Sequence, residues 1–264
     1  MPFDVINDRY WIDERYDFLT SEPFNHIVID NFFKPEVAEK LVEEFPDETS
    51  PKWIYKYKNP IEDKRTCNQW DSFPEFTYST FSYLCSSEFV DIIKQITGND
   101  EVVADIGLHG GGWHSHSRAG NLNVHLDYNI HPKMKMQRKF NLIVYMTPNW
   151  NSKWGGGLEL WSHNEETNKP LRMEKLVENK FNRAVIFDTT QNSWHGLPEK
   201  LTCPQGIMRQ SFAVYYIRHS DTNILRERAL FAPHKEQVND PEILNLIEKR
   251  SDLKKYSEVY RTTE

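Results

Sequence analysis

The sequence predicts a mainly β fold with flanking helices (α+β), built on an antiparallel sandwich or barrel. Between residues 102 and 218, about eight short β-rich runs alternate with turn residues such as Gly, Asn and Pro. Helical periodicity is confined to the segments before and after these runs. The 264 residues are 38% hydrophobic and 27% charged, which is typical of a globular chain with a sizeable core.

The segment 1–100 is expected to form a helical support for the β core. The run 24–33 is expected to contain a strand, His26-Ile-Val-Ile-Asp30. A helix should follow, because Pro35 can occupy its first turn, and it should end before Pro46.

Two further segments complete this support. Residues 46–80 hold no period, so we expect a long surface loop there. Residues 87–97 carry one apolar face and precede Gly98, which predicts a second helix with glycine at its C-terminal cap.

The core is expected over residues 101–218. Its predicted strands cover residues 102–108, 121–128, 139–147, 157–161, 171–177, 183–188, 193–197 and 207–218. Residues 219–264 are expected to add a helical extension, since Asp240 can cap a helix that Pro241 opens. We therefore expect residues 1–264 to form a single domain.

Composition excludes several classes of protein. The net charge of -7 gives no general attraction to phosphate backbones, so a nucleic-acid partner is not expected. No stretch reaches the roughly 18 apolar residues of a membrane span, and residues 1–17 lack the apolar run of a signal peptide. Three widely spaced cysteines suggest a reducing compartment, and we expect a cytoplasmic protein.

The pattern His125-Leu-Asp127 is the most informative motif. In a strand, residues i and i+2 point the same way, so this imidazole and this carboxylate share a face. They are two of the three ligands of a facial triad for non-heme Fe(II). His195, 70 residues later in another β-run, is the candidate third ligand. Taken singly, each histidine also fits an ordinary surface or core position.

The run 207–217 places an arginine on one side of a strand. Its alternation puts one set of residues on one face: Arg209, Ser211, Ala213, Tyr215 and Ile217. A buried guanidinium needs an anionic partner, and a dicarboxylate that also chelates the metal could provide it. Pairing of Arg209 with a structural Asp or Glu is the alternative.

The run 140–147 is split in the same manner. One face is apolar, and the other carries Asn141, Ile143, Tyr145 and Thr147. The Tyr145 hydroxyl could hydrogen-bond the distal carboxylate of such a ligand while Ile143 covers its methylenes. A plain core role for Tyr145 fits the pattern as well.

The order of these motifs resembles that of the Fe(II)- and 2-oxoglutarate-dependent dioxygenases of the prolyl 4-hydroxylase type. The motifs are His125-x-Asp127, Arg138 to Tyr145 and on to Trp150, Trp154-Gly-Gly-Gly-Leu-Glu-Leu160, Trp194-His195-Gly196 and Arg209-x-Ser211. The match covers roughly residues 100–218.

The resemblance implies a double-stranded β-helix, or jelly roll. It implies Fe(II) held by His125, Asp127 and His195, and 2-oxoglutarate anchored by Arg209 with Tyr145. Ser211, Asn141 and Ile143 are expected to line the cosubstrate site. It further implies O2 as co-reactant, with ascorbate as an accessory reductant.

One position departs from the pattern of the family. Ser115 stands where members often have a tyrosine, about ten residues before the metal histidine. His114, His116 or Asn123 are the candidates to replace that contact with the cosubstrate. We expect the glycine-rich run 109–116 to be a flexible rim over the pocket rather than a cupin metal site, because no glutamate follows at the required spacing.

Three functions are weighed. The first is a hydroxylase, and Asp127 argues against a halogenase because related halogenases carry Gly or Ala there. The second is a catalytically silent jelly-roll binding module, and the third is a cupin-like isomerase or metal hydrolase. The complete set of His125, Asp127, His195 and Arg209 favours the first.

The substrate is less defined by the sequence. A prolyl residue in a peptide or protein is the first expectation from the resemblance, and a free amino acid or another small metabolite is the alternative. The segment 52–65 interleaves aromatic and basic residues and could be a substrate lid or a solvated loop.

Overall fold

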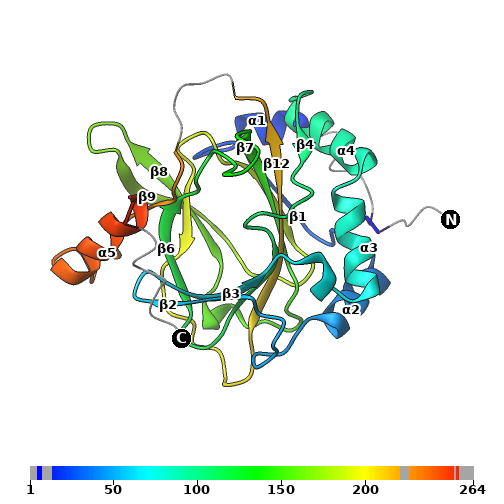
Figure 1. Cartoon of the computed structure of the whole chain (residues 1–264), viewed down its shortest axis with the longest axis horizontal. Coiled ribbons are helices and arrows are strands. Elements are labelled where there is room, and N and C mark those ends of the chain that lie inside the picture. Colours follow the sequence, from blue (N-terminus) through cyan, green and yellow to red (C-terminus); the bar gives the residue numbers. More distant parts are fainter. Residues whose placement is uncertain (1–4, 8–13, 221–225, 253, 256–264) are drawn as a thin grey trace.

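The core of the protein is an antiparallel jelly roll, and Figure 1 shows the helices of the N-terminal third along one side of it and the C-terminal helix at the opposite side. This computed structural model describes residues 5–7, 14–220, 226–252 and 254–255. Its main sheet path runs β1-β10-β7-β12-β5-β3-β6-β11-β8-β9. The mainly β fold with flanking helices is confirmed.

The order of the strands in the sheet differs from their order along the chain. Those on the main path are β1 (His26–Ile29), β3 (Glu62–Cys67), β5 (Gly112–His116), β6 (Asn121–Leu126), β7 (Gln137–Tyr145), β8 (Leu158–Asn164), β9 (Lys169–Val177), β10 (Ala184–Asp188), β11 (Trp194–Leu197) and β12 (Arg209–Arg218). Beside it, β2 (Tyr55–Asn59) pairs with β3, β4 (Val103–Ala104) with β12, and β13 (Leu230–Phe231) with β6.

The helices are short. They are α1 (Arg15–Thr20), α2 (Pro35–Glu44), α3 (Glu75–Leu84), α4 (Ser87–Thr97) and α5 (Pro241–Ser251), with 3-10 turns η2 (Trp70–Ser72) and η3 (Ser152–Trp154). No helix within the described ranges is both long and apolar enough to cross a membrane.

The predicted helices are confirmed at their ends. Pro35 opens α2, which ends at Glu44, two residues before Pro46. Gly98 caps α4 in the left-handed conformation, with φ of 66°. The Asp240 side chain accepts hydrogen bonds from the backbone at the start of α5. The polar leader 1–17 and the end of the extension 219–264 lie partly outside the described residues.

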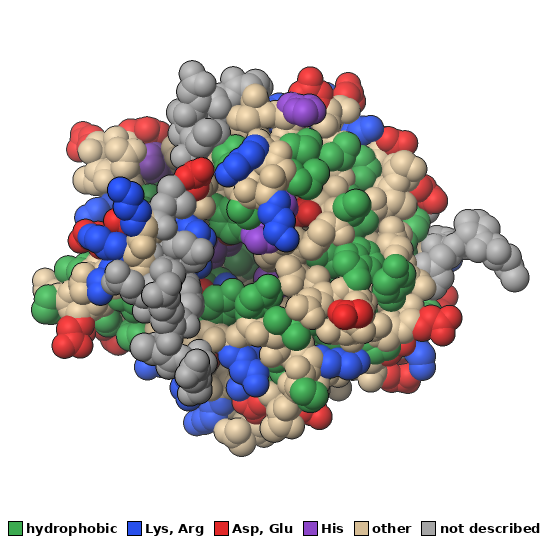
Figure 2. Space-filling view, in the orientation of Figure 1, with side chains coloured by type: hydrophobic (Ala, Val, Ile, Leu, Met, Phe, Trp, Pro, Cys, Tyr) green, Lys and Arg blue, Asp and Glu red, His purple; other side chains and the backbone are tan. Residues whose placement is uncertain are grey.

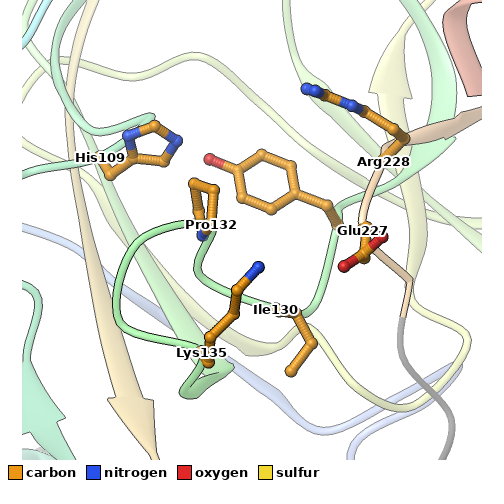
Figure 3. Close-up of a pocket in the computed structure, with 7 residues that line it drawn as sticks. His109, Ile130, Pro132, Lys135, Glu227 and Arg228 are labelled. Carbon is orange, nitrogen blue, oxygen red and sulfur yellow. The ribbon is translucent and has the colours of Figure 1, made fainter. Parts of the chain in front are cut away.

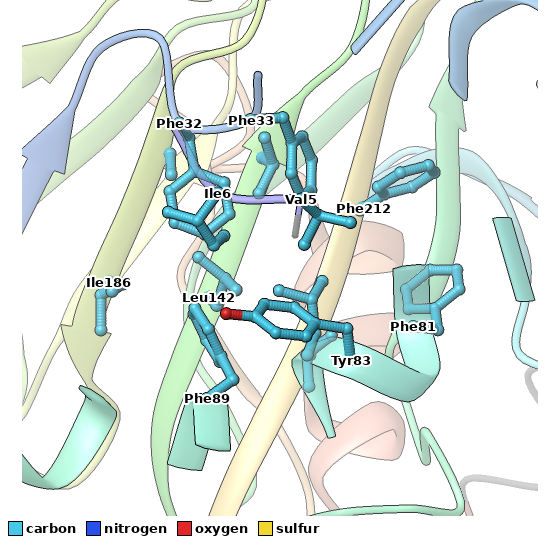
Figure 4. Packing of buried hydrophobic residues seen from close by; sticks show 14 of the residues in the cluster. Val5, Ile6, Phe32, Phe33, Phe81, Tyr83, Phe89, Leu142, Ile186 and Phe212 are labelled. Atoms are coloured by element: carbon cyan, nitrogen blue, oxygen red, sulfur yellow. The ribbon is translucent and has the colours of Figure 1, made fainter. Parts of the chain in front are cut away.

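The sheet has two chemically different faces. The outer face of β7 and β12 packs beneath the helices in an aromatic-rich core, part of which Figure 4 shows. Its members include Phe32, Phe33, Phe81, Phe89, Phe140, Leu142, Val144, Phe212, Val214 and Tyr216. The alternate residues of these strands therefore point to the inner face, as predicted.

The prediction of a long surface loop over residues 46–80 is wrong. This segment contains the β2–β3 hairpin, η2 and the first part of α3, so strands accompany the helices in the first hundred residues. The five residues of β2 lack an apolar alternation because the strand lies largely exposed at the edge. β3 inserts between β5 and β6, and pairing with those strands decides its conformation.

The prediction of a flexible rim over residues 109–116 is also wrong for residues 112–116. Residues 112–116 form β5, which pairs with β12 on one side and β3 on the other. A Cβ at Gly111 would collide with the Ala213 carbonyl, and one at Gly112 with the Cys67 carbonyl. The glycines therefore permit close packing of strands here, and they do not indicate a mobile loop.

Candidate functional site

The pairing of β6 with β11 brings three candidate ligands together. His195 lies opposite His125 in the register, and Asp127 follows the end of β6. The Asp127 carboxylate lies 3.5 Å from His125 Nε2 and 4.0 Å from His195 Nε2. One nitrogen or oxygen from each residue lies within 4.8 Å of the other two, and all three side chains are buried.

Both imidazole rings are oriented by their own backbone. Nδ1 of His125 lies 2.9 Å from the Asn123 carbonyl oxygen, and Nδ1 of His195 lies 2.8 Å from that of Ser193. A carbonyl can only accept, so each Nδ1 carries the proton and each Nε2 keeps a lone pair for a metal. The two rings lie 4.4 Å apart between centroids.

Burial sets the charges of this group. Burial lowers the pKa of His195 to about 4, so its ring is neutral near pH 7. Burial alone would raise the pKa of Asp127, but the positive charge of the Arg138 guanidinium acts in the opposite direction, and the pKa lies below its usual range. A carboxylate beside two imidazoles whose Nδ1 atoms face backbone carbonyls is a donor set suited to a divalent transition metal.

A tyrosine that the sequence analysis gave no role supports this carboxylate. The Tyr215 hydroxyl donates a hydrogen bond to Asp127 Oδ2 at 3.0 Å. The Arg138 guanidinium lies 3.2 Å from the Tyr215 ring centroid and 4.0 Å from that of Tyr128. Alternation had already placed Tyr215 on the face of Arg209, and that shared face was the available signal.

Arg209 lies at the other end of the same inner face. It is 3% exposed, and its Nε donates to the Gly156 carbonyl oxygen at 2.6 Å. Its guanidinium lies 5.0 Å from the Tyr145 ring centroid. Within the described ranges no carboxylate forms an ion pair with it, so the expected alternative of a structural Asp or Glu partner has no support there.

The remaining predicted residues line the stretch between these ends. In the register, Asn141 lies opposite Tyr215, and Tyr145 lies opposite Ser211. The Tyr145 hydroxyl and Asn141 Oδ1 are buried, and neither has a hydrogen-bond partner among the residues that the structure describes. Ile143, between them on β7, packs against the neighbouring apolar cluster.

This arrangement passes a test of fit for the implied metal and cosubstrate. A buried polar atom without a partner costs free energy, and an unpaired buried charge costs more. An elongated anion would relieve these costs, with one end at the His125–Asp127–His195 group and the other at Arg209 and Tyr145. Figure 2 shows a hollow in the middle of one face, with histidine side chains visible inside it.

A cavity of about 250 Å³ lies near this site. Its lining residues are His109, Tyr128, Ile130, Pro132, Lys135, Glu227 and Arg228, six of them labelled in Figure 3. The Tyr128 ring forms part of its wall and also stacks on Arg138, which contacts Tyr215. The cavity is therefore linked to Asp127 through these stacked side chains and does not include the metal-binding group itself.

Comparison with known proteins gives one family match. Residues 112–229 match the model of the 2OG-Fe(II) oxygenase superfamily. The resemblance identified in the sequence is thereby confirmed. No curated protein matches the chain.

Solved structures share the fold at low sequence identity. A prolyl-4-hydroxylase from Pseudomonas putida aligns with a TM-score of 0.53 and 16% identity, over 80% of this chain and 99% of the other. A prolyl hydroxylase from Trichoplax adhaerens, in complex with a peptide of hypoxia inducible factor, aligns with a TM-score of 0.52 and 18% identity, over 80% and 90%. HygX from Streptomyces hygroscopicus, with nickel, 2-oxoglutarate and hygromycin B bound, aligns with a TM-score of 0.50 and 12% identity, over 78% and 86%.

Proposed function

Because residues 112–229 match the 2OG-Fe(II) oxygenase superfamily, we propose that the protein is an Fe(II)- and 2-oxoglutarate-dependent dioxygenase. It hydroxylates an unactivated C–H bond and converts 2-oxoglutarate to succinate and carbon dioxide. One observation carries the proposal: a buried His-Asp-His group and a buried arginine, which has no ion-pair partner among the described residues, face the same interior.

Each end of the site has its own task. His125, Asp127 and His195 would hold Fe(II), which supplies the activation of O2 when bound. Arg209 and Tyr145 bind and orient the distal carboxylate of 2-oxoglutarate, a pairing in which the guanidinium gains the anionic partner that no described residue provides. Ser211, Asn141 and Ile143 line the cosubstrate between these ends. Ascorbate is proposed as the reductant that keeps the iron ferrous.

The proposed substrate is a prolyl residue in a peptide or protein. Two of the structural neighbours are named as prolyl hydroxylases, and one of them is bound to a peptide. A free amino acid or small metabolite is the second candidate. The charged side chains of Lys135 and Glu227 at the cavity beside the site favour it, because they could bind the charged ends of a small molecule.

Succinate release tests the reaction class. We expect the protein with Fe(II), O2 and 2-oxoglutarate to produce succinate, and His125→Ala, Asp127→Ala and His195→Ala each to lose iron binding and turnover. The matched control is His114→Ala, which should keep its iron. Absence of succinate from the unchanged protein with every substrate offered would favour the silent binding module.

A second assay tests the substrate. Proline-containing peptides and free amino acids are offered in parallel, and a mass gain of one oxygen identifies the product. Modification of free amino acids alone would reject the prolyl-peptide proposal and leave the reaction class intact.

We also propose one oxygenase domain in a reducing, cytoplasmic setting. The N-terminal helices share the core of β7 and β12, and the three cysteines, Cys67, Cys85 and Cys203, are free thiols.

A further inference from the structure

His116 is a buried imidazole that the proposed chemistry leaves unused. Its side chain lies on β5, directly opposite Arg209 in the register with β12. Cross-strand neighbours share a face, with Cβ atoms about 5 Å apart, so the ring stands beside the proposed carboxylate anchor. The residue is 2% exposed, and within the described part of the chain neither Nδ1 nor Nε2 has a hydrogen-bond partner.

The other two candidates for a second cosubstrate contact, and Ser115 itself, already form hydrogen bonds. The Asn123 amide nitrogen donates to the Ala232 carbonyl at 3.0 Å and to Gln237 Oε1 at 2.6 Å. The Ser115 hydroxyl donates to the Met208 sulfur at 3.3 Å and lies on the opposite face of β5. His114 Nε2 lies 3.2 Å from the Gly110 carbonyl oxygen.

We propose that His116 is a cosubstrate-binding residue that donates a hydrogen bond to the distal carboxylate of 2-oxoglutarate, beside Arg209. The inference rests on the proposed function and adds to it the group that acts where the family pattern has a tyrosine. It explains why a polar ring occupies a buried position without a partner among the described residues, since the carboxylate supplies the missing acceptor.

The surroundings of His116 keep it a donor. Burial, with the positive charges of Arg209 and Lys64, holds the pKa of His116 well below its usual range, so the ring stays neutral. A neutral imidazole carries one N–H, which suits an anionic acceptor and adds no further repulsion to Arg209. β3 places Lys64 on this face, since Thr66, two residues on, lies opposite His114.

Calorimetry with Mn(II) in place of Fe(II) tests the proposal without turnover. The variants are His116→Leu and His116→Phe, both of which lack a donor, so that either one suffices if the other does not fold. We expect 2-oxoglutarate to bind about 10- to 100-fold more weakly, the effect of losing a hydrogen bond to a charged group. Binding of 2-oxobutanoate, which has no distal carboxylate, should not change between the unchanged protein and the variants.

Two further measurements separate binding from structure. The melting temperature of the ligand-free variants should not fall, because the imidazole loses no protein partner, and Ser115→Ala should keep the affinity for 2-oxoglutarate. Unchanged affinity for 2-oxoglutarate in both His116 variants would overturn the inference and leave the proposed function standing. Equal weakening of both acids, or equal weakening in Ser115→Ala, would also overturn it. A protein that binds no 2-oxoglutarate at all would overturn the proposed function together with the inference.

Discussion

Replacing Tyr215 by Phe removes one atom from the support of the metal-binding group. The hydroxyl donates to Asp127 Oδ2 at 3.0 Å, inside a region where Tyr215 is 6% and Asp127 7% exposed. The phenyl ring of the variant can keep its stack on Arg138, whose guanidinium lies 3.2 Å from the ring centroid. The substitution therefore tests the hydrogen bond alone.

The expected loss follows from the charge and burial of the acceptor. A hydrogen bond to a charged group contributes about 1.5–3 kcal/mol, and water has little access to replace it here. Residues that orient metal ligands typically change metal affinity by about 10- to 100-fold when they are removed. We expect Tyr215→Phe to weaken Fe(II) binding by that factor.

Anaerobic titration with Fe(II) measures the effect, and the next residue on β12 supplies the control. The Tyr216 hydroxyl donates to the Leu84 carbonyl at 3.0 Å on the opposite, apolar face of the sheet. Tyr216→Phe also removes a buried hydrogen bond and should cost about 1 kcal/mol of unfolding free energy, without a change in Fe(II) affinity. Unchanged Fe(II) affinity in Tyr215→Phe, or equal weakening in both variants, would refute the reasoning.

Three other predictions concern the cosubstrate, the product and stability. Arg209→Ala should leave iron bound but weaken 2-oxoglutarate binding by roughly 30- to 4000-fold, because truncating one partner of a buried charge pair costs about 2–5 kcal/mol. Arg209→Lys should recover part of this affinity. Calorimetry that shows no change in Arg209→Ala would place the anchor elsewhere. The product should carry a hydroxyl group even in high chloride, because Asp127 occupies the position a halide would need, and a chlorinated product in the mass spectrum would remove Asp127 from the metal. Asp30→Asn should lower stability at neutral pH, because the hydrogen bond from Arg183 lowers the pKa of Asp30 from 3.8 to about 2. That stabilisation is present above about pH 4 and lost as the pH falls through about 2, so urea midpoints that differ equally at pH 7 and pH 2 would contradict it.

The local pattern of the sequence determined much of the fold. Alternation along β7 and β12 assigned the correct side chains to the inner and outer faces, since the period of a strand is two wherever the strand runs. The proline, glycine and aspartate at the ends of α2, α4 and α5 marked those ends correctly, because helix termini depend on local backbone geometry and capping.

Strands whose conformation depends on their neighbours were not visible in the pattern. β3 reads Glu-Asp-Lys-Arg-Thr-Cys, and its polar residues indicate a loop until β5 and β6 pair with it. The glycines before and at the start of β5 indicate flexibility, although they are there because Ala213 and Cys67 leave no room for a side chain.

For the candidate site too, the sequence predicted some of the residues, and only the tertiary structure brought the others together. The spacing of His125 and Asp127 placed two possible ligands on one face, because residues two apart on a strand point together. Only the register of β6 with β11 brings His195 opposite His125, and only the pairing of β12 with β5 brings His116 beside Arg209. Register depends on contacts between segments about 70 to 90 residues apart, and no local period of the sequence carries that information.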